Sequence, residues 1–212
     1  MQKTLIAIVL TLSPLAAWAQ SRPGTYITDE DIKKVNALPG VDRQIRVVDI
    51  GNENLAVGVV HRGASAPAGA PAGAPAGGAA GRGAPAAAPA EPCGEVAATP
   101  PAGGVPGGIL HESQTESYLI ISGGGTLVTG GHIVNGRKSA PDSGVTKELN
   151  GPSCSGMITG DLVKKVVKTG DIIIIPAGTP HGWIEVGDHV DYLSIRPSAR
   201  VLQAGYVNPA LK

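Results

Sequence analysis

The segment GDIIIIPAGTPH, residues 170–181, decides the fold of this chain. Four consecutive isoleucines are too short and too β-branched a run for a helix, so they predict a strand buried on both faces. Gly170-Asp171 turns the chain into this strand, and Pro176-Ala177-Gly178 ends it, because proline has no N–H to donate to a sheet. The imidazole of His181 follows that turn at a fixed distance. The pattern therefore predicts a single ligand aimed into the mouth of a barrel.

Length and composition favour one domain built from strands. The chain has 212 residues, which is typical of a single domain with appendages. Lysine plus arginine and aspartate plus glutamate number 17 each, so no net charge steers the protein towards nucleic acid or an anionic membrane. Phenylalanine is absent, so valine, isoleucine and leucine must form the core.

The first 19 residues have the pattern of a signal peptide. Lys3 supplies a positive charge, residues 5–12 are apolar, and Ala17-Trp18-Ala19 is a small-x-small cleavage site, so we expect the mature chain to begin at Gln20. A membrane anchor is the alternative, but the apolar run is too short to span a bilayer. We expect an exported protein, periplasmic or extracellular and not embedded in the membrane.

Export makes the two cysteines informative. Cys93 and Cys154 form an even pair in an oxidising compartment, which predicts a disulfide. It would close a loop of about 60 residues and stabilise the fold by about 4 kcal/mol. Free thiols or thiolate metal ligands are the alternatives, and no CxxC spacing supports the metal version.

The N-terminal segment, residues 20–42, contains one predicted helix. Residues 28–38 can be capped by Thr28 with Asp31 three positions later, and Pro39-Gly40 ends the pattern. Its apolar side chains fall on one face, which we expect to lie across the outside of a barrel.

Residues 43–50 and 55–61 predict a hairpin. Alternation allows His61 to point inward near the barrel end, although a histidine bonded to backbone at a strand terminus is the favoured interpretation. Gly123-Gly124-Gly125 predicts a further turn, and His132 is expected to be exposed beside the next one.

Residues 63–108 are almost wholly alanine, glycine and proline. Such a composition has little apolar surface to bury, so we predict a disordered insert. The insert interrupts one domain, residues 43–200, because only both flanks together supply the eight or nine strands that close a barrel. Residues 201–212 are left as a C-terminal tail.

A second informative segment, HESQTESYLIISG, spans residues 111–123. Together with residues 170–181 it resembles the two motifs of the cupin family, small β-barrels that often hold a metal. His111-x4-Glu116-x6-Gly123 is similar to the first motif, whose usual first histidine would fall on Ile109. If His111 is taken as that first histidine instead, Ser113 replaces the second. The spacing from Gly170 to His181 fits the second motif, with Glu185 where cupins usually carry asparagine.

The resemblance implies an all-β fold, a single double-stranded β-helix or jelly-roll barrel with one short N-terminal helix. It also implies a divalent metal ion, Fe, Mn or Zn, held by His111, Glu116 and His181, a set that leaves positions open for substrate or oxygen. The alternative is a degenerate site whose polar groups satisfy one another in a dry barrel.

Four further residues are candidates for a pocket beside the metal. Alternation places Trp183 and Glu185 on the same side of their strand as His181, as pocket wall and as a catalytic acid or base. Tyr118 is a further candidate for the pocket wall. Arg196 is a candidate clamp for a substrate carboxylate, with an external salt bridge as the alternative.

The fold does not choose a reaction. Our leading hypothesis is an exported metal-binding cupin that acts on or binds a small molecule, with oxygenase or isomerase chemistry. The alternative is a non-catalytic exported cupin, ligand-binding or structural, with a degenerate metal site. The resemblance is also compatible with a homodimer.

Overall fold

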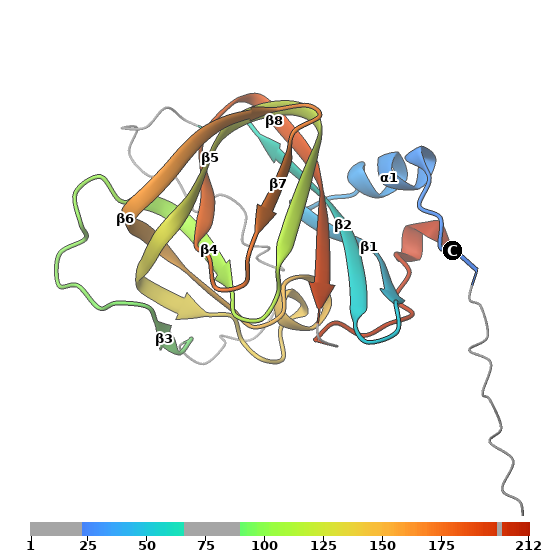
Figure 1. The fold of residues 1–212 in the computed structure, drawn as a ribbon, viewed down its shortest axis with the longest axis horizontal. Helices are drawn as coiled ribbons and strands as arrows, with labels where there is room; N and C mark the ends of the chain where they lie inside the picture. Colours follow the sequence, from blue (N-terminus) through green and yellow to red (C-terminus); the bar gives the residue numbers. More distant parts are fainter. Residues whose placement is uncertain (1–22, 66–89, 199–200) are drawn as a thin grey trace, which may run out of the picture.

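The computed structural model describes residues 23–65, 90–198 and 201–212, which form an antiparallel barrel with one helix on its outside (Figure 1). Helix α1 spans Asp29–Asn36, and two short helical turns are η1 (Val145–Leu149) and η2 (Pro209–Leu211). The strands are β1 (Asp42–Asp49), β2 (Asn54–Gly63), β3 (Pro92–Cys93), β4 (Val105–His111), β5 (Glu116–Lys138), β6 (Ser153–Lys168), β7 (Ile172–Ile175) and β8 (His181–Ser198). The predicted all-β fold class with one short N-terminal helix is confirmed.

The barrel closes because two long strands each take part in more than one pairing. The order β8-β4-β6-β5 returns on itself, since β5 also pairs with β8. β2 and β1 extend the sheet from the other edge of β8, and β7 pairs with the first residues of β5. All of these pairings are antiparallel.

Gly123-Gly124-Gly125 forms no turn, contrary to the prediction. β5 continues through these glycines and changes partners there, pairing with β8 up to Gly123 and with β6 from Gly124 onwards. A side chain would not fit at this corner, because a Cβ on Gly125 would lie 2.3 Å from the carbonyl oxygen of Glu185. The glycines therefore allow close approach of strands at a barrel corner.

Helix α1 begins and packs as the sequence predicts. Thr28 Oγ1 accepts a hydrogen bond from the Asp31 N–H, and the Asp31 carboxylate accepts one from the Thr28 N–H. The two bonds make a complete capping box. Val35 is fully buried against the outward face of β1 and β2, beside Ile45 and Val59. The helix thus covers one outer face of the sheet.

One buried cluster of the barrel interior combines aliphatic side chains with two tyrosines. Tyr118 and Tyr192 lie 4.2 Å apart between ring centroids. The rest of this buried cluster is Val60, Ile120, Leu127, Val167, Ile175, Val186 and Val190.

The prediction that strand 172–175 is buried on both faces is wrong. Ile173 packs against the interior cluster and Ile175 is buried, but Ile172 and Ile174 are each 69% exposed. The reason is that the described elements leave the outer face of β7 uncovered, so its four isoleucines alternate between core and solvent.

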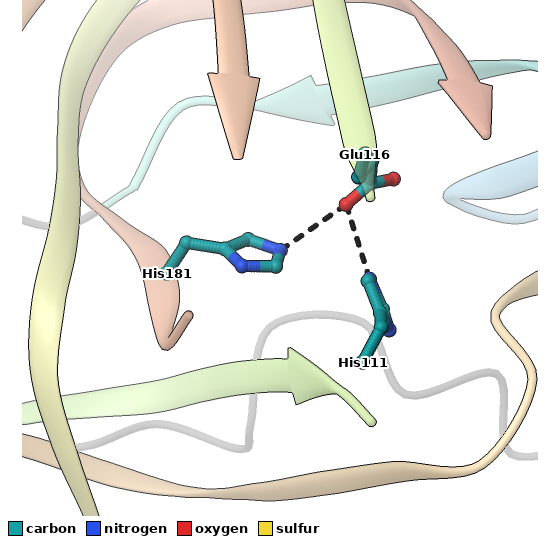
Figure 2. A group of neighbouring side chains, drawn as sticks. All are labelled: His111, Glu116 and His181. Carbon is teal, nitrogen blue, oxygen red and sulfur yellow. Dashed lines mark hydrogen bonds and ion pairs between the residues drawn. The ribbon is translucent and has the colours of Figure 1, made fainter. Parts of the chain in front are cut away.

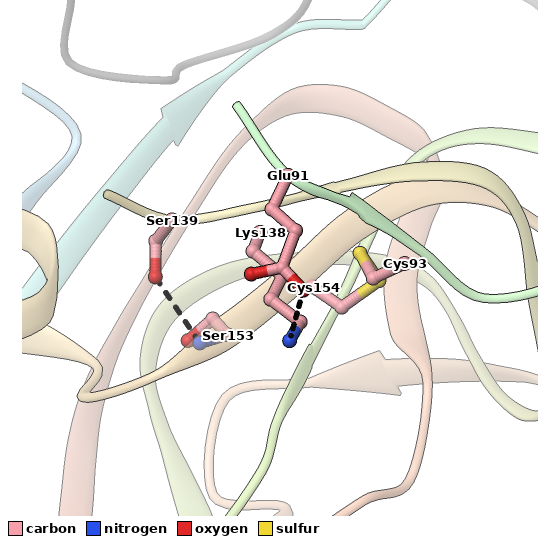
Figure 3. The surroundings of a disulfide bond; sticks show 6 residues. All are labelled: Glu91, Cys93, Lys138, Ser139, Ser153 and Cys154. Carbon is pink, nitrogen blue, oxygen red and sulfur yellow. Dashed lines mark hydrogen bonds and ion pairs between the residues drawn. A yellow bond between two sulfur atoms is a disulfide. The ribbon is translucent and has the colours of Figure 1, made fainter. Parts of the chain in front are cut away.

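The predicted disulfide between Cys93 and Cys154 is present, with the Cα atoms 6.0 Å apart (Figure 3). It joins β3 to β6, across 61 positions of sequence. Lys138 and Glu91 form an ion pair of 3.0 Å beside it. The bond ties a residue inside the predicted insert to the barrel wall.

Some predicted segments fall outside the described residues, namely the signal peptide, residues 1–19, and most of the insert, residues 66–89. Residues 90–108 are described and carry β3 and the start of β4, so ordered structure begins before the predicted end of the insert. The C-terminal segment packs along β1, where the Val47 N–H donates to the Tyr206 carbonyl. No helix in the described ranges is long and apolar enough to cross a membrane.

Candidate metal centre

Three strand ends bring His111, Glu116 and His181 together (Figure 2). His111 is the last residue of β4, Glu116 the first of β5 and His181 the first of β8. The turn before His181 is anchored to β4, because the Gly178 N–H donates to the His111 carbonyl at 2.7 Å. Gly178 has φ 75°, a conformation that glycine adopts without strain. The Pro-x-Gly turn thus directs His181 towards the other two side chains.

The three side chains converge on one oxygen of the carboxylate. His111 Nε2 lies 3.0 Å and His181 Nε2 3.2 Å from Glu116 Oε2. The ligand atoms all lie within 4.8 Å of one another. The residues are buried, with 3%, 2% and 3% of His111, Glu116 and His181 exposed.

The backbone selects the tautomer of His181. Its Nδ1 lies 3.0 Å from the Thr179 carbonyl, which can only accept, so Nδ1 carries the proton of the neutral ring. The Nε2 atom then presents a lone pair towards Glu116. This buried nitrogen has no hydrogen bond of acceptable geometry among the described residues. An unpartnered buried nitrogen aimed at a carboxylate is what a metal-ligating histidine provides.

A serine selects the tautomer of His111 in the same way. Ser153 Oγ donates to the Gly151 carbonyl at 2.9 Å, so it accepts from His111 Nδ1, also at 2.9 Å. The neutral ring then presents its Nε2 lone pair to Glu116. Burial lowers the pKa of His111, and this effect outweighs the opposing influence of Glu116, so the neutral form is favoured.

The carboxylate of Glu116 is held in its charged form. Its Oε1 accepts from Arg196 Nε at 2.9 Å and from the Ser194 hydroxyl, and its Oε2 accepts from Tyr118 Oη at 3.0 Å. Burial by itself would raise the pKa of Glu116, and Arg196 is the first of the influences that instead hold it well below its usual range. Two imidazole lone pairs therefore face an anionic oxygen, and a cation between them would relieve the repulsion.

This donor set suits the expected metals. Two imidazole nitrogens and one carboxylate oxygen are ligands that Zn, Fe and Mn accept. Each imidazole also has a partner for its other nitrogen, as metal-binding histidines almost always do. The residues present therefore fit a divalent cation.

The structure does not leave Arg196 free to clamp a substrate carboxylate. The side chain is 1% exposed, and its remaining nitrogens donate to the Leu149 carbonyl at 3.0 Å and to Asp42 at 2.5 Å. The alternative, an external salt bridge, is equally excluded by this burial. Burial alone would lower the pKa of Arg196, yet Asp42 and Glu116 raise it. Arg196 is a buried cation that positions Glu116.

Trp183 and Glu185, which were predicted to share one side of their strand, lie in different environments. Trp183 lies half-buried in the barrel interior, with its ring 5.7 Å from that of Tyr192. Glu185 is exposed and accepts from Thr126 Oγ1 at 3.2 Å, so the predicted alternation breaks after Trp183 and the structure does not bring Glu185 to the cluster. Val186 takes the inward position instead.

Sequence reasoning missed three polar contacts of the cluster. Ser153, Ser194 and the Tyr118 hydroxyl each bond to a candidate ligand. Ser194 and Arg196 share an inward face of β8 by alternation, which is the one signal that could have found Ser194. Ser153 carries no local signal, because it reaches His111 only through the β4–β6 pairing.

The remaining histidines lie elsewhere and pair with acidic side chains. His61 points outward and contacts Asp191 at 2.6 Å, so neither an inward ring nor a ring bonded to backbone is found. His132 is exposed, as predicted, and lies 3.0 Å from Glu95. His189 contacts Asp188 and Ser122.

The three side chains of the cluster are buried. Two cavities among the described residues lie beside η1 and the C-terminal segment, and neither is lined by His111, Glu116 or His181. The larger, about 530 Å³, is bounded by residues of 145–149 and 201–206.

No protein-family model matches the chain, and no curated protein matches it. Among solved structures it is similar to an uncharacterized conserved protein with a double-stranded beta-helix domain from Klebsiella pneumoniae, at 15% identity over 91% of this chain and 95% of that one, with a TM-score of 0.34. A cupin protein from Bacteroides fragilis is similar at 17% identity over 72% of both chains, with a TM-score of 0.29.

A recombinant oxalate oxidase in complex with glycolate is similar at 16% identity, with a TM-score of 0.33. The similarity covers 77% of this chain and 54% of the oxalate oxidase chain. The likeness to these structures is one of fold alone and says nothing of the reaction.

Proposed function

We propose that this chain is a cupin-type barrel that holds a divalent metal ion on His111, Glu116 and His181 and acts on or binds a small molecule. The observation that carries the proposal is the convergence of both imidazole Nε2 atoms on Glu116 Oε2, at 3.0 and 3.2 Å. The unpartnered, buried Nε2 of His181 is the second support, since a hydrogen-bonded structural histidine would not leave it so.

A bound metal would supply a Lewis-acid centre with positions left for a small ligand, as oxygenase or isomerase chemistry requires. Neighbouring groups of the protein would fix the orientation of the three ligand side chains. Thr179 and Ser153 orient the two imidazoles, and Arg196 and Ser194 keep one carboxylate oxygen occupied. Glu116 thus offers its other oxygen to the cation. The burial of the cluster strengthens each of these electrostatic contacts.

The second candidate function is a non-catalytic exported barrel, ligand-binding or structural, in which the same residues satisfy one another. Its supporting observation is that Glu116 already has donors on both oxygens, from Arg196, Ser194 and Tyr118. The burial of the cluster also favours it, and neither of the two cavities described above is lined by its residues.

Metal analysis of purified protein separates the two functions. The wild type is loaded with Fe, Mn or Zn under anaerobic conditions, desalted, and analysed for bound metal. We expect one equivalent in the wild type and none in His181→Ala. His132→Ala is the matched control, because this exposed histidine lies outside the cluster, and it should bind like the wild type. If the wild type retains no metal, the metal-dependent function is refuted and the non-catalytic function takes its place.

Export remains part of the proposal. It rests on the N-terminal pattern of residues 1–19 and agrees with the disulfide, which is typical of oxidising compartments. N-terminal sequencing of the protein expressed with its full leader should find Gln20 as the first residue. An intact Met1 in the mature protein would refute cleavage.

A further inference from the structure

The outer face of the barrel carries a second group of chemically active side chains. It lies where β2, β8 and β5 run side by side, and the register of these strands places His61, Asp191 and Ser122 opposite one another. His189 comes two positions before Asp191 on β8, so it projects from the same face of that strand. None of these residues belongs to the candidate metal centre.

Two hydrogen bonds through one imidazole ring join Ser122, His189 and Asp188. Ser122 Oγ lies 2.8 Å from His189 Nε2, and Asp188 Oδ2 lies 2.6 Å from His189 Nδ1. An ionised carboxylate can only accept, so Nδ1 carries the proton of the neutral ring. Nε2 is then an acceptor, and the Ser122 hydroxyl donates to it. A nucleophile, a base and an orienting carboxylate follow one another in this order when a protein activates a serine.

Two backbone features hold Ser122 beside His189. The pairing of β5 with β8 shifts register between Ile120 and Ser122, which marks a β-bulge, and bulges redirect side chains. Gly123 then packs directly on the backbone of β8, because a Cβ at this position would overlap the His189 carbonyl oxygen. Its φ of 66° is a conformation that glycine adopts without strain. The backbone therefore fixes the serine next to the imidazole.

This group is open to solvent, unlike the candidate metal centre. The His189 side chain is 32% exposed and Ser122 is half-buried. The side chains of His111 and His181 are each only 3% exposed. A small molecule in solution can therefore approach the Ser122 hydroxyl without any opening of the barrel.

We infer that Ser122, His189 and Asp188 form a second site, which hydrolyses small carboxylic esters. Ser122 Oγ attacks the ester carbonyl carbon while His189 Nε2 takes the hydroxyl proton. His189 then gives this proton to the departing alkoxide, which leaves as an alcohol. Water next attacks the acyl-serine, releases the carboxylic acid and restores the hydroxyl. Asp188 is a positioning residue that holds the imidazole in the reactive tautomer.

The net reaction converts one ester and one water into one acid and one alcohol, so it needs no metal and no redox partner. An ester is the fitting substrate class, because an alkoxide leaves more readily than the amine of an amide does. The site thus lies outside the metal-dependent function proposed above and does not rest on it.

A fluorophosphonate probe tests the site, because such probes react with serines that a neighbouring base activates. The full chain is treated in the presence of EDTA, and mass spectrometry of its peptides locates the modified residue. We expect one modification in the wild type, on Ser122, and none in Ser122→Ala. Ser143→Ala is the matched control and should be labelled like the wild type, since the Ser143 hydroxyl contacts the Ala140 carbonyl and Thr146 instead of an imidazole.

Labelling rates test the imidazole and the carboxylate. His189→Ala should slow labelling by about 10²–10⁴-fold, the usual contribution of a general base. His132→Ala should react at the wild-type rate, because His132 contacts Glu95 instead of a serine. Asp188→Asn should slow labelling by only about tenfold, since the Asp188 side chain is 93% exposed and its hydrogen bond contributes little. Asp188→Glu should restore the rate.

Hydrolysis of p-nitrophenyl acetate gives a second readout. Its kcat/KM should fall to the buffer background in Ser122→Ala and stay at the wild-type value in Ser143→Ala. A wild type that the probe leaves unmodified, or modifies at another residue, overturns the inference. Labelling of His189→Ala as fast as the wild type also overturns it, because Ser122 would then react without its base. These outcomes leave the proposed metal site standing, since they are recorded in EDTA and change no residue of the cluster.

Discussion

Arg196 Nε donates to Glu116 Oε1 at 2.9 Å across 80 positions of sequence, and both side chains are buried. The contact joins the last strand, β8, to the start of β5 inside the barrel. It keeps the candidate metal-binding carboxylate charged and leaves its second oxygen directed at the imidazoles. The site therefore depends on the buried guanidinium of Arg196. Of the three expected metal ligands, Arg196 contacts only Glu116 among the hydrogen bonds and ion pairs of the described residues.

Arg196→Met should destabilise the protein by about 3–5 kcal/mol, because it leaves the carboxylate of Glu116 buried without its cation. Urea unfolding of the metal-free protein measures the loss. Lys33→Met is the control, since it breaks the exposed pair with Asp29 and should leave the unfolding midpoint unchanged. Equal midpoints for Arg196→Met and the wild type would contradict a structural role for the buried pair.

Acid should destabilise the metal-free protein in two stages. Burial lowers the pKa of His111 below 6.5. As the pH falls through about 6.5, the unfolded chain binds a proton at this residue while the folded chain does not, so the folded state loses stability. Burial would raise the pKa of Glu116, but it is held well below 4.5, first of all by Arg196. Its contribution to stability is therefore present above pH 4.5 and is lost as the pH falls further. The free energy of unfolding should decline through both ranges.

Urea midpoints recorded across these pH values test the two stages. His111→Asn should remove the component near pH 6.5 and keep the one at lower pH. His132→Ala should retain both, because His132 is exposed outside the cluster. A wild type whose stability increases on acidification below pH 6.5 would show that the sign is wrong.

Removal of the disulfide should cost about 4 kcal/mol, since Cys93 and Cys154 close a loop of 61 positions. The double variant Cys93→Ala/Cys154→Ala should unfold at a lower urea concentration than oxidised wild type and at about the same concentration as reduced wild type. Mass spectrometry after alkylation without reductant should find no modified thiol in the wild type. Two modified thiols would mean that the bond does not form.

Gly125→Ala should destabilise the barrel by about 1–3 kcal/mol, because the new Cβ would lie 2.3 Å from the Glu185 carbonyl and force β5 away from β8. Gly187→Ala is a matched control, with nothing within 4 Å of the added atom. Thermal unfolding compares the two variants. Similar melting temperatures for both would contradict close strand packing at this corner.

Shortening the alanine-, glycine- and proline-rich segment should be tolerated only up to residue 89. Replacing residues 66–89 by a Gly/Ser segment of half the length changes loop closure by about 0.6 kcal/mol, in the stabilising direction. A deletion that continues to residue 108 removes β3, Cys93 and the start of β4, and should lower the melting temperature strongly. A collapse of the transition in the shorter replacement would refute the prediction that this segment is an insert.

Local chemistry in the sequence was sufficient for several features. The capping box of Thr28 and Asp31 needs only residues three positions apart, and it forms as predicted. The Pro-x-Gly turn at 176–178 and the spacing to His181 likewise depend on neighbours in sequence. His111, Glu116 and His181 could be named together because each follows or precedes a strand at a motif position.

Only the tertiary structure decided which strand faces are covered and which polar groups meet. Ile172 and Ile174 are exposed because the described elements place nothing over β7, and Glu185 faces solvent because alternation breaks before Val186. The Tyr118 hydroxyl reaches the carboxylate through shared strand geometry, whereas Arg196 reaches it from a strand 80 positions away. Burial and pairing of this kind depend on contacts between distant segments, which composition and short-range spacing do not encode.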